Sequence, residues 1–217
     1  MVWIKICGIT NLEDAERISE LGVDAVGFIL STNSPRRIEV SKAKKIIEAL
    51  RAKENKISIV GVFVNEEIWK VLKDSESLKL DYMQLSGDED RDYLKDLREK
   101  AKDVKIIKSI RIKSKNEFYR DEINKKVGRL KEYADFILLD KYSKNVYGGT
   151  GVPFDWDIVK DCCWEIPVII SGGLDAGNVR QAVDTVKPFG VDASSRLEIY
   201  PGKKDSDKVR QFVNVIK

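Results

Sequence analysis

Few side chains in this sequence can move protons, because the 217 residues include no histidine. That absence excludes Ser-His-Asp and Cys-His catalysis and any zinc site with histidine ligands. Acid–base chemistry therefore falls to Asp, Glu, Cys, Lys or Tyr. Two such residues end short apolar segments: Cys7 closes Trp-Ile-Lys-Ile-Cys, and Asp140 closes Phe-Ile-Leu-Leu-Asp. These two side chains are therefore candidates for acid–base chemistry.

Both residues also have an interpretation without chemistry. A cysteine at a strand end is often a small buried apolar residue, whereas a thiol with a lowered pKa at an open strand end is a general base or nucleophile. Partial burial of Asp140 predicts a raised pKa and a carboxyl that holds a proton at neutral pH, as a general acid must. The alternative for Asp140 is a carboxylate paired with Lys5 or Lys141.

Two turns near the end of the chain are suited to phosphate. Ser171-Gly-Gly-Leu174 and Asp192-Ala-Ser-Ser195 each follow an apolar segment and precede a predicted helix. Backbone N–H groups in such turns, beside the positive ends of helix dipoles, bind phosphate without Lys or Arg. These glycines could instead serve only tight turns, but the presence of both turns favours phosphate. The predicted phosphate contacts are Gly172, Gly173, Ser194 and Ser195.

The elements that must position these residues are short β-branched strands separated by charged amphipathic helices. Two of the strands are nearly continuous apolar runs, which is typical of strands buried on both faces. The predicted strands are Trp3–Cys7, Ala25–Leu30, Ile57–Phe63, Tyr82–Leu85, Val104–Ile110, Phe136–Asp140, Pro167–Ser171 and Gly190–Ala193.

Capping signals and hydrophobic periodicity place helices between these strands. Thr10 begins a capping box with Glu13, and Ser41 is a predicted cap for a helix through Leu50. Further helices are predicted over 115–132 and 205–216, and a helix after Trp156 is expected to hold Cys162 and Cys163 as packing residues.

Eight strand–helix units of about 27 residues each predict a closed (β/α)8 TIM barrel of the α/β class. An open doubly wound sheet is the competing architecture, but it usually has fewer strands and leaves edges exposed. Without a linker or low-complexity tract, residues 1–217 are expected to form one catalytic domain. In a barrel, functional residues lie where strands end, which agrees with the positions of Cys7 and Asp140.

The composition restricts the function further. The 39 Lys and Arg residues against 36 Asp and Glu leave a formal charge of +3 with interleaved signs, which argues against nucleic acid as a partner. No apolar run is long enough to span a membrane, and the N-terminus does not resemble a secretory leader. We therefore expect a cytoplasmic protein. Three cysteines without Cys-x-x-Cys spacing indicate neither a metal site nor a disulfide framework.

The ordered motifs of the whole chain resemble the phosphoribosylanthranilate isomerase family of tryptophan biosynthesis. The segments that carry the resemblance are Lys5–Thr10, Gly27–Phe28, Ser34–Arg36, Val60–Asn65, Gln84–Leu85, Leu138–Asp140, Gly148–Gly151, Phe154–Trp156, Ser171–Leu174, Gly190–Ser195 and Pro201–Asp205. Each motif alone is modest evidence, whereas their coincidence in order is strong.

This resemblance implies a barrel that rearranges N-(5-phosphoribosyl)anthranilate to 1-(2-carboxyphenylamino)-1-deoxyribulose 5-phosphate without cofactor or metal. It implies that Cys7 is the general base, Asp140 the general acid, and Arg36 the ligand of the anthranilate carboxylate. It also implies that Asp192 lies near the ribose hydroxyls. The stretch 141–152, with Gly149 and Gly151, is expected to close over the site as a lid. A homodimer or an association with other enzymes of the pathway is a possible assembly.

The chain departs from the family pattern at three positions. Ser86 stands where a histidine is usual, Arg196 where a glycine is usual, and Val152 where a lysine is frequent. Arg196 is strained if its backbone needs a positive φ, and otherwise adds a charge near the phosphate.

Two other functions stay open: a bifunctional phosphosugar isomerase that also acts in histidine biosynthesis, and a phosphate-binding barrel without catalysis. A second phosphate site opposite the first would favour the former, and no second glycine-rich pair is present.

Overall fold

Eight parallel strands form a closed barrel in the computed structural model, which describes residues 1–31, 33–53, 56–112, 118–141, 153–160, 162 and 164–217. Each strand pairs with the next along the chain, and the eighth pairs with the first. The closed ring confirms the predicted (β/α)8 barrel and excludes the open doubly wound sheet. The strands are β1 (Trp3–Cys7), β2 (Ala25–Ile29), β3 (Ser58–Phe63), β4 (Tyr82–Leu85), β5 (Lys105–Ile112), β6 (Phe136–Lys141), β7 (Val168–Ile170) and β8 (Gly190–Ala193).

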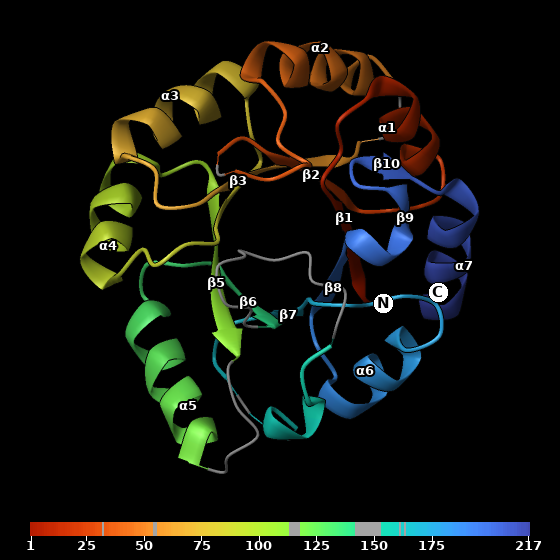
Figure 1. The fold of residues 1–217 in the computed structure, drawn as a ribbon. Helices are drawn as coiled ribbons and strands as arrows, with labels where there is room; N and C mark the ends of the chain where they lie inside the picture. Colours follow the sequence, from red (N-terminus) through yellow and green to blue (C-terminus); the bar gives the residue numbers. More distant parts are fainter. Residues whose placement is uncertain (32, 54–55, 113–117, 142–152, 161, 163) are drawn as a thin grey trace.

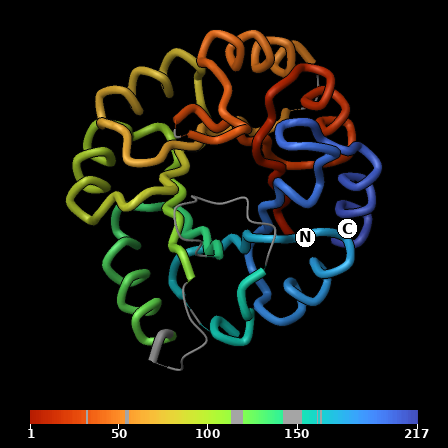
Figure 2. Tube along the Cα trace, in the orientation of Figure 1, coloured from red at the N-terminus to blue at the C-terminus, as the bar shows by residue number. Residues whose placement is uncertain are grey.

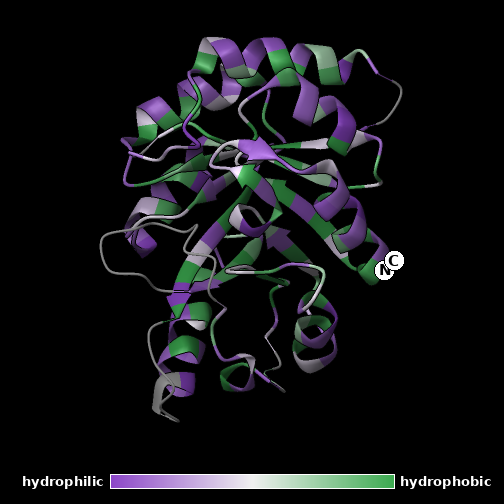
Figure 3. Ribbon diagram, turned by 45° about the vertical axis from the view of Figure 1, so that its right-hand side comes forward, coloured by the Kyte–Doolittle hydropathy of each residue, from purple (hydrophilic) through white to green (hydrophobic). Residues whose placement is uncertain are grey.

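The helices surround the strands as an outer ring (Figures 1 and 2). Each of these helices mixes hydrophobic and hydrophilic residues along its length (Figure 3). The hydrophobic ones are buried against the barrel, as Ala43, Ile46, Ile47 and Leu50 of α2 are. The helices are α1 (Leu12–Ser19), α2 (Val40–Arg51), α3 (Ile68–Leu78), α4 (Arg91–Lys100), α5 (Phe118–Leu130), α6 (Val179–Val186) and α7 (Ser206–Ile216). The described residues contain no helix long and apolar enough to cross a bilayer.

Two helices begin at other residues than the capping signals predicted. Asn11, not Thr10, caps α1 by accepting a hydrogen bond from the backbone N–H of Asp14 at 2.9 Å. The Thr10 hydroxyl instead donates to the carbonyl of Gly202. The helix α2 begins at Val40, one residue before the predicted cap Ser41. Local capping patterns therefore located both helices but not their first residues.

The sixth and eighth units depart from a simple strand–helix repeat. Among the residues described between β6 and β7, the regular element is a 3-10 turn, η1 (Trp156–Ile158), and not the predicted α-helix. Cys162 lies after that turn in irregular chain, and Cys163 lies outside the described residues. After β8 the chain forms a 3-10 turn, η2 (Ser195–Leu197), and an antiparallel pair that the sequence did not predict, β9 (Glu198–Tyr200) and β10 (Lys203–Lys204).

Alternation along each strand separates an outer core from the barrel interior. Ile4 and Ile6 of β1 belong to the large cluster under the helices, whereas Cys7 belongs to a second, smaller apolar cluster. Burying each aliphatic side chain of the outer core contributes about 1.5–3 kcal/mol to stability. The opposite parity turns Lys5 and Cys7 of β1 inward, which is how the strands deliver polar groups to the mouth of the barrel.

Candidate active site

A pocket opens at the carboxyl ends of the strands and encloses about 660 Å³ of space, part of it open to solvent. Five predicted site residues line it: Cys7, Arg36, Asp140, Asp192 and Ser194. They come from β1, the chain after β2, β6, β8 and the turn after β8, so only the closed barrel brings them together.

Cys7 lies beside a buried ion pair. The ammonium of Lys5 donates to Asp192 Oδ1 at 2.8 Å, and the Lys5 side chain is fully buried. The strand register makes this pair, because Lys5 of β1 faces Asp192 of β8. On the other side of β1, a Cβ added at Gly27 would lie 2.8 Å from Cys7 Sγ and 3.1 Å from Lys5 Nζ. Gly27 therefore leaves the room that the thiol and the ammonium occupy.

Burial raises the pKa of the Cys7 thiol, while the nearby Lys5 ammonium acts in the opposite direction and Asp192 adds to the rise. The sequence left two interpretations of Cys7 open, a buried apolar residue and a base with a lowered pKa. The pKa is raised because removing the thiolate from water costs more than the attraction of Lys5 returns. The pKa of Lys5 is raised although burial, the largest influence, lowers it, because Asp192 and Cys7 together favour the ammonium. Lys5 thus carries a positive charge in the barrel.

Burial raises the pKa of Asp140 to about 7, against the lowering influence of a hydrogen bond from the Lys141 backbone N–H, which reaches Asp140 Oδ1 at 2.8 Å. The alternative of an ion pair with Lys5 or Lys141 does not hold for the described residues. Lys5 pairs with Asp192, and the Lys141 ammonium donates to the carbonyl of Pro153. Asp140 is therefore a half-buried carboxyl that holds a proton near neutrality.

The Ser-Gly-Gly turn after β7 packs directly against Asp140. Gly172 and Gly173 have φ values of +91° and +64°, which side chains strongly disfavour. A Cβ at Gly172 would lie 2.7 Å from Asp140 Oδ1. The two glycines follow Ser171, which lines the pocket, and Ser195 begins η2 next to Ser194, which also lines it. The backbones of both turns thus border the pocket, but these three residues are not among its lining.

The backbone of Arg196, which stands where the family usually has glycine, is not strained. Positive φ among the described non-glycine residues occurs at Asn65, Lys79 and Lys187, so Arg196 carries no such strain. Its guanidinium forms an ion pair with Asp175. That ion pair links the turn after β8 to the turn after β7. Ser86, in place of the usual histidine, lines the pocket and accepts a hydrogen bond from Gln84 at 3.1 Å.

Two residues that line the pocket, Gln84 and Arg111, and the buried Lys5 beside Cys7 were missing from the sequence-based site. Lys5 was considered only as a partner for Asp140, and Gln84 and Arg111 were given no role. Gln84 Oε1 is buried and accepts no hydrogen bond within the described part of the chain, although the side chain lines the pocket. Strand alternation could have identified them. Residues two apart on a strand share a face, and Lys5, Gln84 and Arg111 each lie two positions from another inward residue.

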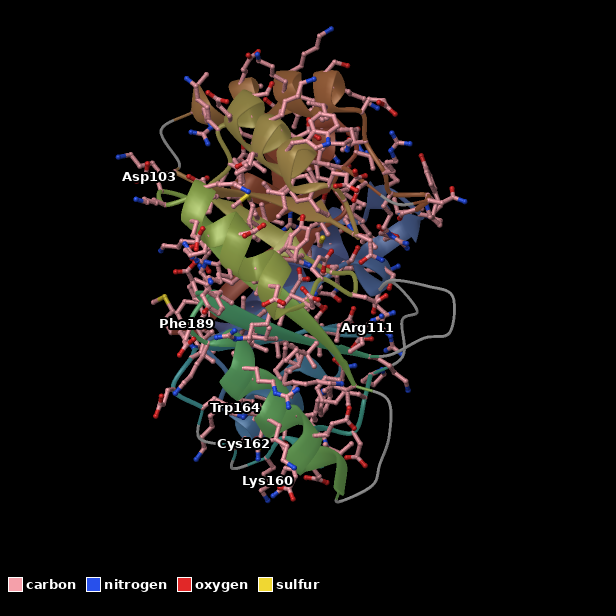
Figure 4. The ribbon with its side chains drawn as sticks, turned by 90° about the vertical axis from the view of Figure 1, so that its left-hand side faces the viewer. Asp103, Arg111, Lys160, Cys162, Trp164 and Phe189 are labelled. Carbon is pink, nitrogen blue, oxygen red and sulfur yellow. The ribbon has the colours of Figure 1, made fainter. Side chains whose placement is uncertain are left out.

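Other predicted positions lie elsewhere. Gly149, Gly151 and Val152 fall outside the described residues. Cys162 lies on the flank of the barrel, away from the mouth that Arg111 marks in Figure 4. Within the described ranges no three His, Cys, Asp or Glu side chains gather as metal ligands would.

The fold and this pocket define a (β/α)8-barrel enzyme of the acid–base class, with a buried thiol, a protonated carboxyl and an arginine around one cavity. A family model described as N-(5'phosphoribosyl)anthranilate (PRA) isomerase matches residues 4–215. The chain belongs to this family. It is therefore an isomerase that acts on N-(5′-phosphoribosyl)anthranilate in tryptophan biosynthesis.

Individual relatives support the same assignment along the whole chain. The N-(5'-phosphoribosyl)anthranilate isomerase of Rubrobacter xylanophilus is 41% identical over 217 residues, covering 100% of both chains. The crystal structure of phosphoribosyl anthranilate isomerase from Thermotoga maritima has a TM-score of 0.84 at 36% identity, covering 99% of this chain and 98% of that one. A further structure of the isomerase, at 36% identity and a TM-score of 0.80, holds reduced 1-(o-carboxyphenylamino)-1-deoxyribulose 5-phosphate and covers 99% of this chain and 97% of that one.

Proposed function

We propose that Cys7 and Asp140 carry out the rearrangement as general base and general acid. The observation that supports this most is that a thiol and a carboxyl with a pKa of about 7 line one pocket from strands separated by β7 and β8. The reaction needs one proton delivered to the ribose ring oxygen and another removed from C2′. Neither proton transfer requires imidazole.

In this mechanism the Asp140 carboxyl protonates the ring oxygen as the C1′–O bond breaks, which leaves an iminium between C1′ and the anthranilate nitrogen. The Cys7 thiolate then takes the C2′ proton, and the electrons of the C2′–H bond form the C1′–C2′ double bond of an enolamine. Addition of a proton at C1′ and loss of the 2′-hydroxyl proton complete the aminoketose. Proton uptake and release balance over these steps, so no cofactor is needed.

Two anchors would hold the sugar between acid and base. We infer that the turns with Gly172, Gly173, Ser194 and Ser195 bind the phosphate through their backbone N–H groups. Arg36, whose side chain reaches the pocket, would bind the anthranilate carboxylate. Asp192, held by Lys5, would accept a hydrogen bond from a ribose hydroxyl. Fixing both ends of the substrate in one orientation supplies part of the rate enhancement.

Replacing each member of the pair tests the mechanism. Cys7→Ala and Asp140→Asn are each expected to reduce kcat by about 10²–10⁴-fold, the usual contribution of a positioned acid or base. Turnover of freshly prepared substrate is followed by fluorescence, and circular dichroism checks the fold. Wild-type turnover by either folded variant contradicts the assignment for that residue.

Further properties follow from the family and are proposed at the same level. We infer that residues 1–217 act as a single catalytic domain in the cytoplasm. One solved relative, from Thermotoga maritima, is described as a dimer that was converted to monomers. A homodimer is the assembly we propose for this chain, and sedimentation at micromolar concentration measures it.

A further inference from the structure

Arg36 is held by a carboxylate that belongs to the unpredicted strand pair β9–β10. Glu198 Oε1 accepts from Arg36 Nε at 2.9 Å, and Glu198 Oε2 accepts from Nε at 3.0 Å and from Nη2 at 2.8 Å. Both side chains are largely withdrawn from water, with 12% of Arg36 and 3% of Glu198 exposed. The two residues are separated by 162 positions in the sequence.

This contact fixes which edge of the guanidinium faces the pocket. A guanidinium has five N–H donors in one plane. Glu198 engages Nε and one hydrogen of Nη2, which leaves Nη1 and the second hydrogen of Nη2 as a fork. A fork of two parallel N–H groups matches a carboxylate in bidentate geometry. Without Glu198, the long side chain of Arg36 would sample several rotamers, and the fork would not be presented in one direction.

A carboxylate against Arg36 would also cancel the positive charge that attracts an anion, unless a second cation is present. Lys204 is that cation. Its ammonium donates to Glu198 Oε1 at 2.8 Å, and 1% of its side chain is exposed. Arg36, Glu198 and Lys204 together retain a single positive charge. Burial lowers the pKa of Lys204, and Glu198 acts against that change.

Lys204 also connects the network to the turn after β8. The ammonium lies 3.2 Å from the Ser194 carbonyl oxygen and 3.3 Å from its Oγ, and Ser194 Oγ donates to the Cys7 carbonyl at 2.9 Å. The guanidinium, one phosphate turn and the strand that carries the thiol are thus connected by buried polar contacts. Buried ion pairs are weak sources of stability, because their desolvation often exceeds their attraction. A positional role accounts better for their presence here.

We propose that Glu198 and Lys204 are positioning residues, which orient Arg36 and preserve its net positive charge for the carboxylate of the substrate. This inference rests on the proposed role of Arg36 and adds the residues through which that role is achieved. Neither Glu198 nor Lys204 lines the pocket, so both act through Arg36. The strand pair β9–β10 is then part of the specificity of the site.

The test compares two ligands in a double variant. The ligands are the reduced product analogue, 1-(o-carboxyphenylamino)-1-deoxyribulose 5-phosphate after reduction, and its phenylamino counterpart without the carboxyl group. Their ratio of Kd values measures what the carboxylate contributes. Glu198→Gln combined with Lys204→Met keeps the charge of the cluster at +1, so a change in the ratio reports orientation and not charge.

In the wild type we expect the ligand with the carboxylate to bind about 100-fold more tightly than the ligand without it. In the double variant we expect this ratio of Kd values to be about 10-fold or less. The affinity for the carboxyl-free ligand should change by less than about threefold, which a general loss of structure would not allow. In turnover, KM should rise by a larger factor than kcat falls, because Lys204 also lowers the pKa of the Cys7 thiol and its loss reduces the thiolate. A carboxylate ratio as high as the wild type's in the folded double variant overturns the proposal.

Two control variants separate a failure of the proposed role of Arg36 from a failure of the proposed roles of Glu198 and Lys204. Arg36→Ala should abolish the carboxylate ratio, and if it does not, the proposed role of Arg36 fails before that of its partners. Glu89→Gln with Lys108→Met removes an ion pair of similar burial outside the pocket and should leave the ratio unchanged.

If the first double variant does not fold, Glu198→Asp replaces it. The shorter carboxylate keeps the charge but cannot reach both Arg36 and Lys204. The ratio should then fall below the wild-type value, and an unchanged ratio overturns the proposal.

Discussion

Replacing Lys5 with Met is expected to lower turnover by changing the ionisation of Cys7. Lys5 Nζ and Cys7 Sγ lie 3.1 Å and 2.8 Å from the same point, the position of a Cβ added at Gly27. At the largest separation this allows, about 6 Å, and an effective dielectric constant of about 20, two unit charges interact by about 3 kcal/mol, or about two pKa units. Losing the ammonium should therefore raise the pKa of the Cys7 thiol, because an attraction of about this size or more is lost.

The effect on the pH profile follows from the order of the two pKa values. Burial raises the pKa of Asp140 to about 7 and raises that of Cys7 above its ordinary value, so the acid has the lower pKa of the pair. Reaction needs protonated Asp140 together with ionised Cys7. Consequently kcat/KM rises up to the pKa of Asp140, stays level between the two values and falls above the pKa of Cys7.

The height of that plateau depends on the difference between the two pKa values. Lys5→Met is therefore expected to lower the plateau by about 100-fold or more and to move the alkaline limb upward. The acid limb should move much less, because burial and not Lys5 dominates the pKa of Asp140.

The assay is kcat/KM by fluorescence across the pH range in which the protein stays folded, with thermal unfolding measured in parallel. Lys108→Met is the matched control, since it removes an equally buried lysine that pairs with Glu89 outside the pocket. It should cost stability and leave the plateau in place. A Lys5→Met plateau at the wild-type height, or an equal fall in Lys108→Met, would refute the reasoning.

Three other substitutions have distinct expected outcomes. Arg36→Ala should raise KM by about 10- to 100-fold with less effect on kcat, whereas Arg37→Ala, whose side chain is half exposed in a surface ion pair, should leave both within about twofold, as steady-state kinetics will measure. Gly172→Ala should weaken inhibition by inorganic phosphate and also reduce kcat, because its Cβ would meet the carboxyl of Asp140. Arg196→Ala should weaken phosphate inhibition by less than about fivefold, because an exposed ion pair contributes about 1 kcal/mol at most.

The positions of the chemistry were predictable because a parallel barrel presents strand ends at one face. Cys7 and Asp140 end apolar runs, and the pocket lies where both runs end. The same alternation would have identified Lys5, two residues before Cys7 on the same face. Its partner Asp192 was not predictable as an ion-pair partner, because a closed barrel makes β1 and β8 neighbours but does not fix the register that sets Lys5 beside Asp192.

Other features depended on energies or contacts that local patterns do not contain. The direction of the Cys7 pKa shift depends on the balance between burial and one buried ammonium, which a sequence does not quantify. Glu198 meets Arg36 across 162 residues, and a two-residue strand such as β10 has too short a pattern to be predicted. Thr10 illustrates a local failure, since a tertiary contact with Gly202 occupied the hydroxyl that was expected to cap α1.

The joining of β1 to β8 has a consequence for how the protein is made. Of the eight barrel strands, β1 is synthesised first and its second neighbour, β8, is synthesised last, so the ring cannot close until β8 has been made. Until then the ammonium of Lys5 keeps its hydration shell. A shift of β1 by one residue at closure would set an isoleucine opposite Asp192. The charges of Lys5 and Asp192 would then lie unpaired in an apolar interior. The ion pair therefore favours the register of β1 and β8 that the structure shows.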